Sequence, residues 1–364
     1  MTNFPLLKLP AVALHEVMKM MMPFEMFKLA MCSVQIESFL RHRKYKTDVL
    51  YIHLRSNASQ FNLCHSDGWQ TIVFESTTSH LMEMSLSLRY TRENDKFMSM
   101  THANFDEIFD IQRKICDICH VPFLEWVLYI DSMQAHFFYL LNKILKTEYN
   151  KLTLLHGRLN ESTLTEVMDK VPITKMLEIS SDIPSTFDHP NALKYFHTHF
   201  IDARWVKLES LFSIRNVHIV KLVKTNFDCS DLNRFLRYWV DCDEFMLRSL
   251  EFGLKDGTVY DEAVITDQLT TVSNHDKIFM KSKKDAGQKY VVGRLKLRET
   301  IVIFSTWDPN EWYSDISQRL DRKRELEEKI AEIKRTIRES GHNSVELEQL
   351  NMQLIELDLA TFEI

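Results

Sequence analysis

The sequence has 364 residues, of which 45% are hydrophobic and 26% are charged, and its formal net charge is −6. This length predicts two or three domains with a sizeable core, and the mildly acidic balance gives no reason to expect binding to nucleic acid or to a membrane. Seven glycines and eight prolines disfavour a turn-rich β-barrel or sandwich. The sequence contains no long apolar run, so no membrane span is predicted.

The N-terminal segment, residues 4–40, is predicted to be helical and unusually apolar. An apolar lead at residues 4–7 reaches Leu9 and Pro10, and a proline suits the first turn of a helix because its missing N–H has no partner there. One apolar stripe with helical spacing follows: Leu14, Val17, Met18 and Met21. Pro23 is predicted to end this helix and to open a second one.

The second helix is apolar on almost its whole circumference. One face is expected to contain Phe24, Phe27, Met31 and Val34, and another Met26, Leu29, Ala30 and Ser33. Such a helix must be buried on more than one side, yet forty residues rarely form a self-sufficient core. The segment is therefore predicted to offer apolar surface to its own downstream domain and to a partner. An ordinary buried helical pair is the alternative.

The same residues resemble the F-box in its nematode form. That pattern runs leucine-proline, a spaced apolar helix, a break with proline and a helix ending in a Cys-Ser pair, and this sequence matches it at Leu9, Pro10, Leu14, Val17, Met18, Met21, Pro23, Phe24, Glu25, Leu29, Cys32 and Ser33. It departs from the pattern at Met26, Phe27 and Met31, where the family favours leucine and serine. The resemblance implies docking onto a Skp-type adaptor of a cullin–RING ubiquitin ligase. The implied adaptor-facing residues are Leu9, Pro10, Leu14, Val17, Met18, Met21, Phe24 and Leu29.

Beyond a basic hinge at residues 41–46, strand and helix patterns alternate. Strands are predicted at residues 49–54, 71–74, 84–88, 126–130, 151–154, 175–179, 210–214 and 250–254, and helices at 104–119, 132–145, 162–170 and 229–240. Strands separated by helices favour parallel pairing. An irregular stack similar to leucine-rich repeats fits this pattern, although the asparagine ladder of that motif is missing. An ordinary α/β or α+β domain is the alternative.

A second resemblance concerns residues 231–307. An amphipathic helix at 231–240 is followed by an alternating strand at 245–252, a basic strand at 278–289 and an apolar strand at 299–307 that ends in tryptophan. This order looks like the type 2 F-box-associated domain of nematode F-box proteins. The basic strand departs from the family pattern at residues 283–287, where a tight Lys-Asp-Gly turn is spread out.

The C-terminal tail is predicted to form two helices. A 4-3-4 spacing of apolar residues occurs twice, at Leu326, Ile330, Ile333 and Ile337 and then at Leu347, Leu350, Leu354 and Leu357. Gly341 and Asn343 in the intervening break are typical of a helix stop and a helix cap. The pattern favours an antiparallel hairpin over the alternative, one long helix in an intermolecular coiled coil.

The sequence contains no convincing catalytic or metal-binding motif. Cys116, Cys119 and His120 match the c-type haem attachment pattern, but they lie on a helical, apolar stretch where thiols are typical of a core. His197 and His199 with Asp202 could bind a metal, yet such pairs are mostly surface or capping residues. The six cysteines lack regular spacing, which indicates reduced thiols in the cytosol or nucleus.

The fold class predicted is α/β (mixed α and β), with an N-terminal helical F-box at residues 1–46, an irregular leucine-rich-repeat-like strand–helix domain at 47–310 and a C-terminal antiparallel helical hairpin at 311–364. The function predicted is a non-catalytic substrate-receptor subunit of a Skp–cullin–F-box ubiquitin ligase, cytoplasmic and/or nuclear. Its expected partners are a Skp-type adaptor, through it a cullin, and an unknown protein target, with no cofactor, metal, nucleic acid or membrane. The alternative is a non-catalytic scaffold that acts through the hairpin and has a vestigial F-box.

Overall fold

The computed structural model describes residues 8–56, 58–65, 68–76, 96–102, 105–274, 276–283, 290–298, 301–310, 313–340 and 345–359. The apolar lead predicted at 4–7, the strand predicted at 84–88 and the break predicted at 341–343 lie outside these residues. The chain divides into two compact units, residues 1–158 and 159–364, and each is described by itself. The predicted domain limits at residues 46 and 310 stay predictions.

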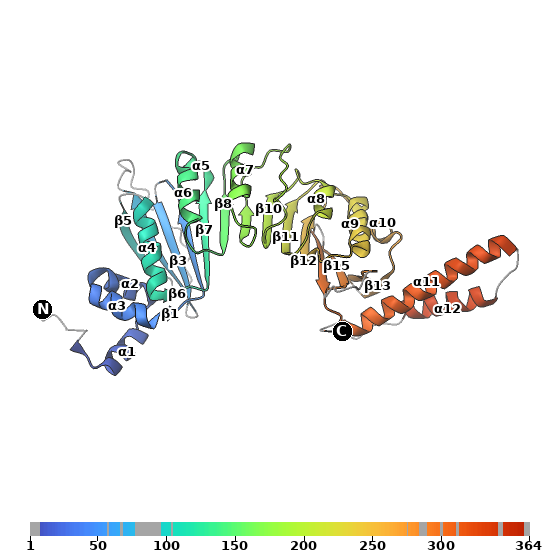
Figure 1. Ribbon diagram of the computed structural model, residues 1–364, viewed down its shortest axis with the longest axis horizontal. Coiled ribbons are helices and arrows are strands. Elements are labelled where there is room, and N and C mark those ends of the chain that lie inside the picture. The colour runs from blue at the N-terminus through green and yellow to red at the C-terminus, as the bar shows by residue number, and fades with distance from the viewer. Residues whose placement is uncertain are drawn as a thin grey trace. The chain divides into compact units, whose positions relative to one another are not determined.

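The first unit begins with three helices, α1 (Ala11–Lys19), α2 (Pro23–Cys32) and α3 (Val34–Arg43), and continues into a mixed sheet (Figure 1). The strand order is β8-β7-β2-β3-β4-β5, and the strands are β2 (Val49–Leu54), β3 (Ala58–His65), β4 (Gly68–Ser76), β5 (Lys96–His102), β7 (Phe123–Tyr129) and β8 (Lys151–Leu155). Strands β2, β7 and β8 run parallel, whereas β3 is antiparallel to both of its neighbours. Two short strands, β1 (Tyr45–Lys46) and β6 (Cys119–His120), pair separately.

The core of this unit lies between the sheet and its helices, α4 (Phe105–Ile118), α5 (Ile130–Met133) and α6 (Phe137–Ile144). Strand β2 alternates strictly, so that Leu50, Ile52 and Leu54 are fully buried. Trp126 of β7 is also fully buried: its ring centroid lies 5.0 Å from that of Phe109 in α4, and its Nε1 donates to Thr147 Oγ1 at 3.2 Å. The strands predicted at 49–54, 126–130 and 151–154 are confirmed as β2, β7 and β8, and the helix predicted at 104–119 as α4, although Ile130 begins α5 and Cys119 lies in β6.

The second unit contains an eight-strand sheet in the order β9-β10-β11-β12-β16-β15-β14-β13. Its elements are α7 (Glu161–Lys170), β9 (Met176–Ile179), β10 (His197–Asp202), α8 (Leu208–Phe212), β11 (Val217–Lys224), α9 (Cys229–Asp241), β12 (Leu247–Gly253), α10 (Glu262–Thr266), β13 (Thr271–Asn274), β14 (Lys277–Lys281), β15 (Val292–Arg298) and β16 (Ile301–Trp307). Strands β9 to β12 are parallel and the remaining pairs are antiparallel. The predicted parallel pairing and the mixed α/β class are confirmed.

Helix α9 shows why the sequence pattern at 229–240 succeeded. Asp228 and Asp231 form a reciprocal capping box at its start. Its apolar face packs on β16, where the rings of Phe235 and Trp239 lie 5.9 and 5.0 Å from that of Phe304. The packing is so close that a Cβ added at Gly293 would lie 2.7 Å from the Phe304 ring.

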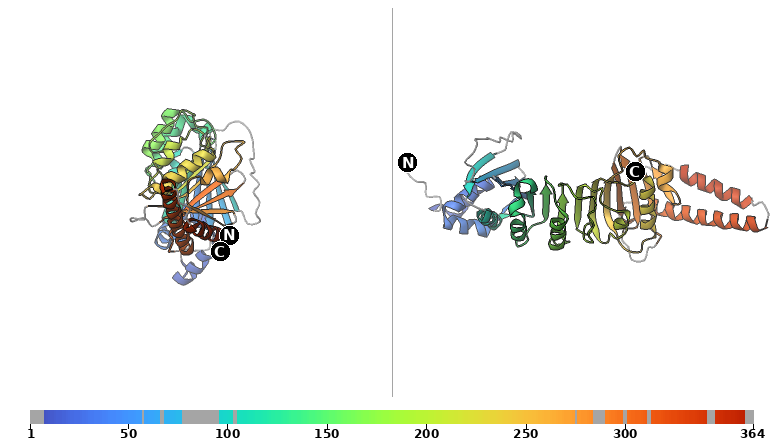
Figure 2. Two further views of the ribbon diagram at one scale, coloured as in Figure 1. Left: turned by 90° about the vertical axis from the view of Figure 1, so that its right-hand side faces the viewer. Right: turned by 90° about the horizontal axis from the view of Figure 1, so that it is seen from above.

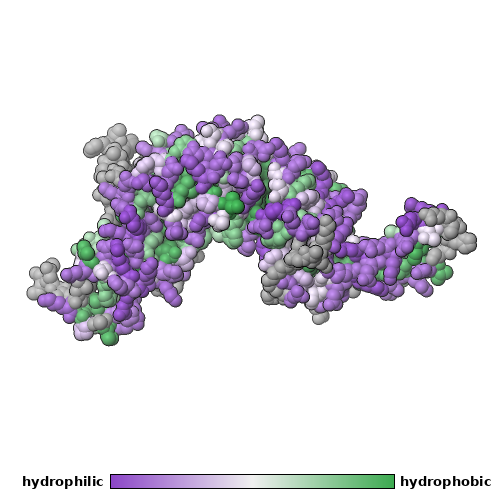
Figure 3. Space-filling view, viewed as in Figure 1, coloured by the Kyte–Doolittle hydropathy of each residue, from purple (hydrophilic) through white to green (hydrophobic). Residues whose placement is uncertain are grey.

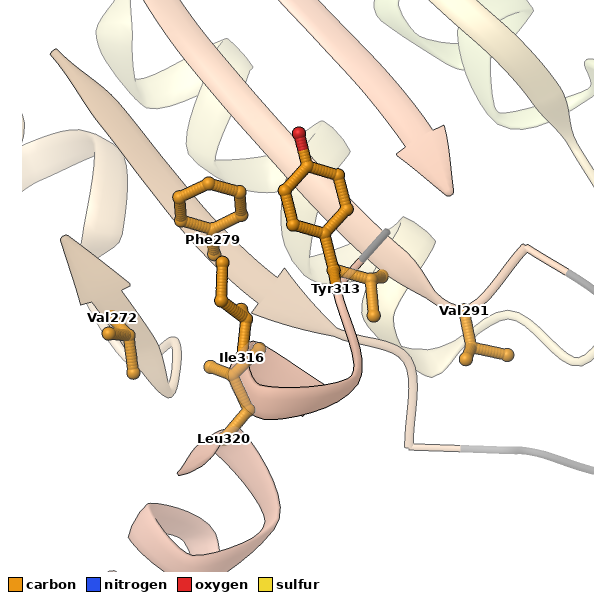
Figure 4. Close-up of a cluster of buried hydrophobic side chains, with 7 residues drawn as sticks. Val272, Phe279, Val291, Tyr313, Ile316 and Leu320 are labelled. Atoms are coloured by element: carbon orange, nitrogen blue, oxygen red, sulfur yellow. The ribbon is translucent and has the colours of Figure 1, made fainter. Parts of the chain in front are cut away.

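The C-terminal tail forms two helices that lie side by side, α11 (Ser314–Ser340) and α12 (Val345–Leu359) (Figure 2). The first turns of α11 lie against β13 to β15 through a cluster of buried side chains (Figure 4) that includes Phe279, Tyr313, Ile316 and Leu320. An ion pair of 2.6 Å between Lys281 Nζ and Asp321 Oδ2 also joins the sheet to α11. The predicted helical hairpin is confirmed.

One predicted strand is wrong, and several strands were not predicted. Residues 210–214 were expected to be extended, but α8 occupies Leu208–Phe212, because Leu208 and Leu211 are spaced to bury one side of a helical turn. The strands that were not predicted include β3, β5, β11, β13 and β15. In β15 polar residues on one face alternate with apolar residues on the other.

Candidate functional site

The N-terminal helices carry the residues that are predicted from the sequence to face an adaptor. Pro10 directly precedes α1, and its carbonyl oxygen accepts the Leu14 N–H at 2.9 Å. Pro23 is the first residue of α2, and the Met22 N–H donates to Glu25 Oε2 at 2.9 Å, which caps the helix start. The predicted helix, break and second helix around Pro23 are therefore confirmed.

The second helix is shorter than the apolar pattern indicated. Ser33 is extended, with φ −153° and ψ 118°, and its side chain accepts the Ile36 N–H at 3.4 Å to begin α3. Val34 therefore does not continue the face of Phe24 and Phe27, and its side chain is 81% exposed. The predicted placement of Val34 on that face is wrong, because serine after Cys32 acts as a helix cap.

Contacts within the first unit hold these helices in place. Phe24, Met26 and Phe27 of α2 are buried, and the Phe24 N–H donates to the buried Gln70 Oε1 of β4 at 3.0 Å. Arg41 at the end of α3 pairs with Asp117 of α4 at 3.0 Å. One side of the helical segment is thus committed to its own unit, as the all-round apolar pattern of α2 predicted.

The eight candidate adaptor-facing residues fall into two groups. Leu14, Met18 and Phe24 are buried, with exposed fractions of 5%, 0% and 6%, so their side chains hold the helices together and do not reach the surface. The other five are accessible: Leu9, Val17, Met21 and Leu29 are half-buried, and Pro10 is exposed. The residues that could meet a partner are therefore those of the second group.

Two further apolar side chains at this surface, Val12 and Met20, were not singled out from the sequence. They are 76% and 78% exposed, as Val34 is at 81%, and Figure 3 shows hydrophobic surface in this part of the molecule. Val12 and Met20 lie off the buried stripe of α1. The sequence signal that could have identified them is an apolar residue that falls outside the stripe which the helix buries.

The segment predicted as a basic hinge, residues 41–46, runs from the end of α3 into β1. Arg41 to Arg43 form the last turn of α3, where cations favour the carboxyl end of a helix, and Tyr45–Lys46 form β1. Arg43 Nη1 lies 2.7 Å from His15 Nδ1 of α1, so this end of α3 also contacts α1.

The other sequence candidates lie apart from this surface. Cys119 is buried in β6, and burial raises the pKa of its thiol to about 12, so it is a poor nucleophile at neutral pH. His199 Nδ1 lies 3.2 Å from Glu178 Oε2 on the neighbouring strand β9. Within the described ranges, no group of three or more His, Cys, Asp and Glu side chains could hold a metal ion. No helix among the described residues is long and apolar enough to cross a membrane.

Comparison with known proteins shows one distant similarity. An uncharacterized protein of Caenorhabditis elegans is 23% identical over 278 residues, which is 69% of this chain and 62% of the relative. The chain thus spans less than two thirds of the length of that relative. No protein-family model matches the chain, and no solved structure matches it.

Proposed function

We propose that this chain is a substrate-receptor subunit of a Skp–cullin–F-box ubiquitin ligase, cytoplasmic and/or nuclear. It binds a Skp-type adaptor through α1 to α3 and holds a protein target elsewhere on its surface. In this function it catalyses no step itself; it raises the local concentration of the target near the transferring subunits. The support is the F-box-like order of residues 9–33 together with their helical, partly unburied conformation.

The observation that supports docking most directly is the exposed apolar surface of the N-terminal helices. Val12, Met20 and Val34 are each at least 76% exposed, whereas Phe24 and Phe27 are buried within the unit. Burying one such exposed side chain in an interface contributes about 1–2 kcal/mol. Together with the half-buried Leu9, Val17, Met21 and Leu29, this surface could sustain a stable complex after association costs are met.

Replacing Leu9 and Pro10 together by alanine is expected to remove co-purification of a Skp-type adaptor. These two residues lie at the entry to α1, where the apolar contact surface begins, and neither is fully buried. A second variant, Val34→Asp, places a charge on an exposed side chain of α3, and we expect it to weaken adaptor binding at least about 20-fold. Titration calorimetry with purified adaptor measures both.

Val259→Asp is the matched control, because Val259 is 84% exposed and lies in the second unit. It introduces the same charge and should leave adaptor affinity unchanged. Circular dichroism confirms that each variant is folded. Undiminished adaptor binding by both N-terminal variants, or equal losses in all three, would refute docking through these helices.

A second candidate function is a scaffold that acts through the C-terminal hairpin. Helix α12 exposes Val345, Met352 and Ile355 at 72%, 57% and 50%, at a spacing of seven and three residues that is typical of a coiled-coil seam. Its other stripe, which includes Leu350 and Leu354, is only half-buried. A two-helix hairpin with apolar surface on this scale is suited to association with further helices.

For the scaffold function, we expect the chain to exceed its monomer mass of 43.2 kDa in solution. Met352→Glu together with Ile355→Glu should return it to that mass, because charges in the seam oppose helix association. Light scattering after size-exclusion chromatography measures the mass. A monomeric wild-type chain that binds the adaptor would reject the scaffold and leave the ligase function in place.

A further inference from the structure

A groove opens in the second unit at the amino ends of three parallel strands, β9, β10 and β11. Its accessible volume is about 540 Å³, within the range of pockets that accept ligands. The lining residues come from the three segments that precede these strands: Ile173, Thr174, Lys194, Phe196, Ser213, Arg215 and Asn216. The groove therefore lies within the second unit, where loops at the amino ends of adjacent strands form it.

Two large apolar side chains in this groove remain open to solvent. Ile173 is 50% exposed and Phe196 is 43% exposed, although neighbouring residues such as Leu193 and Tyr195 are buried. The Phe196 ring stacks on the ring of His218, with centroids 5.0 Å apart and planes 3° from parallel. A flat, supported aromatic surface of this kind can accept the apolar side chain of a ligand.

Backbone hydrogen bonds fix these side chains relative to one another. The Phe196 N–H donates to the Ile173 carbonyl at 2.7 Å, and the Phe196 carbonyl accepts from the N–H groups of His218 and Ile219 at 3.1 and 3.3 Å. The segments before β9, β10 and β11 are thus tied together at one residue. A ligand would lose little free energy in ordering this surface, because it is already ordered.

The segment before β11, which lines the groove with Ser213, Arg215 and Asn216, is also held in place. The Arg215 guanidinium donates to the carbonyl oxygens of Phe212 and Ile214, both at 2.7 Å, and to the Tyr238 hydroxyl at 2.9 Å, and it pairs with Glu244. Arg215 therefore holds the segment before β11 in place and is not free to follow a ligand.

The residues that line the groove include two cations, Lys194 and Arg215, and no acidic residue, but the charge of Arg215 is balanced by its ion pair with Glu244. The uncompensated charge among the lining residues is therefore the positive charge of Lys194. Lys194 is exposed, and it takes part in none of the ion pairs found among the residues that the structure describes. An incoming carboxylate could therefore pair with Lys194 without displacing an internal partner.

From these contacts, we propose that this groove binds a short extended segment of a partner protein in which an apolar side chain lies beside acidic residues. The apolar side chain packs between Ile173 and Phe196, and an adjacent carboxylate pairs with Lys194. That such a segment belongs to a degradation target rests on the proposed ligase function; the binding itself does not.

Selection from a library of random peptides about nine residues long, displayed on phage, tests this with the purified full-length chain. We expect enrichment of peptides with an aromatic or branched aliphatic residue flanked by Asp or Glu. The affinity of a synthetic copy of the enriched peptide should fall at least about 10-fold in Lys194→Glu and in Ile173→Asp. Fluorescence anisotropy of the labelled peptide measures this.

Two matched variants control for charge alone. Lys224→Glu reverses the charge of an exposed lysine of β11 outside the groove, and Val259→Asp adds a negative charge at an exposed valine. Both should change peptide affinity less than about 2-fold. Enrichment of basic or uncharged peptides, no enrichment at all, or equal losses in groove and control variants would each overturn the proposal.

Adaptor binding by the same groove variants separates this inference from the proposed function. Groove variants that lose the peptide yet retain the adaptor support both. A chain that binds adaptor but shows no acidic–apolar selection overturns the groove alone. A chain that selects such peptides but binds no adaptor supports the groove and rejects the ligase function.

Discussion

Gly157→Ala is expected to lower the free energy of unfolding of the first unit by about 3–5 kcal/mol. Gly157 has φ +71°, a left-handed conformation that costs most residues about 1–3 kcal/mol. A Cβ at this position would also lie 2.7 Å from the Asp131 backbone nitrogen and 3.1 Å from its Cα. These are main-chain atoms at the start of α5, so they cannot rotate away as a side chain could, and overpacking adds about 1–3 kcal/mol.

Gly257→Ala provides the matched control. Gly257 has φ +81°, yet no described atom lies within 4 Å of a Cβ built there, so only the backbone cost of about 1–3 kcal/mol applies and no overpacking is added. Urea unfolding is monitored by hydrogen-exchange mass spectrometry at β2 for the first unit and at β11 for the second, so that each unit gives its own unfolding transition. A loss in Gly157→Ala no larger than that in Gly257→Ala would show that the segment at Asp131 moves to admit the methyl group.

The sequence predicted elements well where a pattern agreed with local capping. Helix α9 was predicted from its amphipathic pattern alone, and in the structure the capping box of Asp228 and Asp231 agrees with that pattern by marking the helix start. The strand predicted at residues 210–214 was wrong because a run of five residues is too short to show a clear period, and burial of Leu208 with Leu211 favoured a helical turn. Strand order could not be read at all, because pairing partners such as β12 and β16 lie far apart in the sequence.

The candidate docking residues show a different limit of prediction from sequence. Helical spacing correctly grouped Leu14 and Met18, but it could not tell whether their stripe faces the chain or a partner, and both are buried in the chain. Which face remains outward depends on contacts such as Phe24 with Gln70, 46 residues away, and on the Ser33 cap that turned Val34 outward. The groove at Phe196 gave no sequence signal, because its three segments come together only in the folded sheet.

His53 is a partly buried histidine whose surroundings favour its neutral form. Its ring, on β2, lies near the rings of Tyr51 and Tyr129, with centroids 6.5 and 6.1 Å away. The Arg55 guanidinium lies 4.0 Å from the centroid of the same Tyr129 ring. Burial, and secondarily the charge of Arg55, lowers the pKa of His53 to about 4 from its ordinary 6.5.

The first unit should therefore lose stability as the pH falls from about 6.5 towards 4. In this window the unfolded chain binds a proton at His53 and the folded chain does not, so protonation favours unfolding; above pH 6.5 neither state is protonated and nothing is lost. The expected loss attributable to His53 is about 2 kcal/mol near pH 5 and about 3 kcal/mol near pH 4.

His53→Gln keeps a polar side chain that does not titrate and should remove this component. The test compares urea unfolding of both chains near pH 7.5 and pH 5, followed at the β2 amides. The same change in unfolding free energy in the two chains would mean that the imidazole binds its proton in the folded state, with Arg55 and the tyrosine rings moving to accommodate the charge.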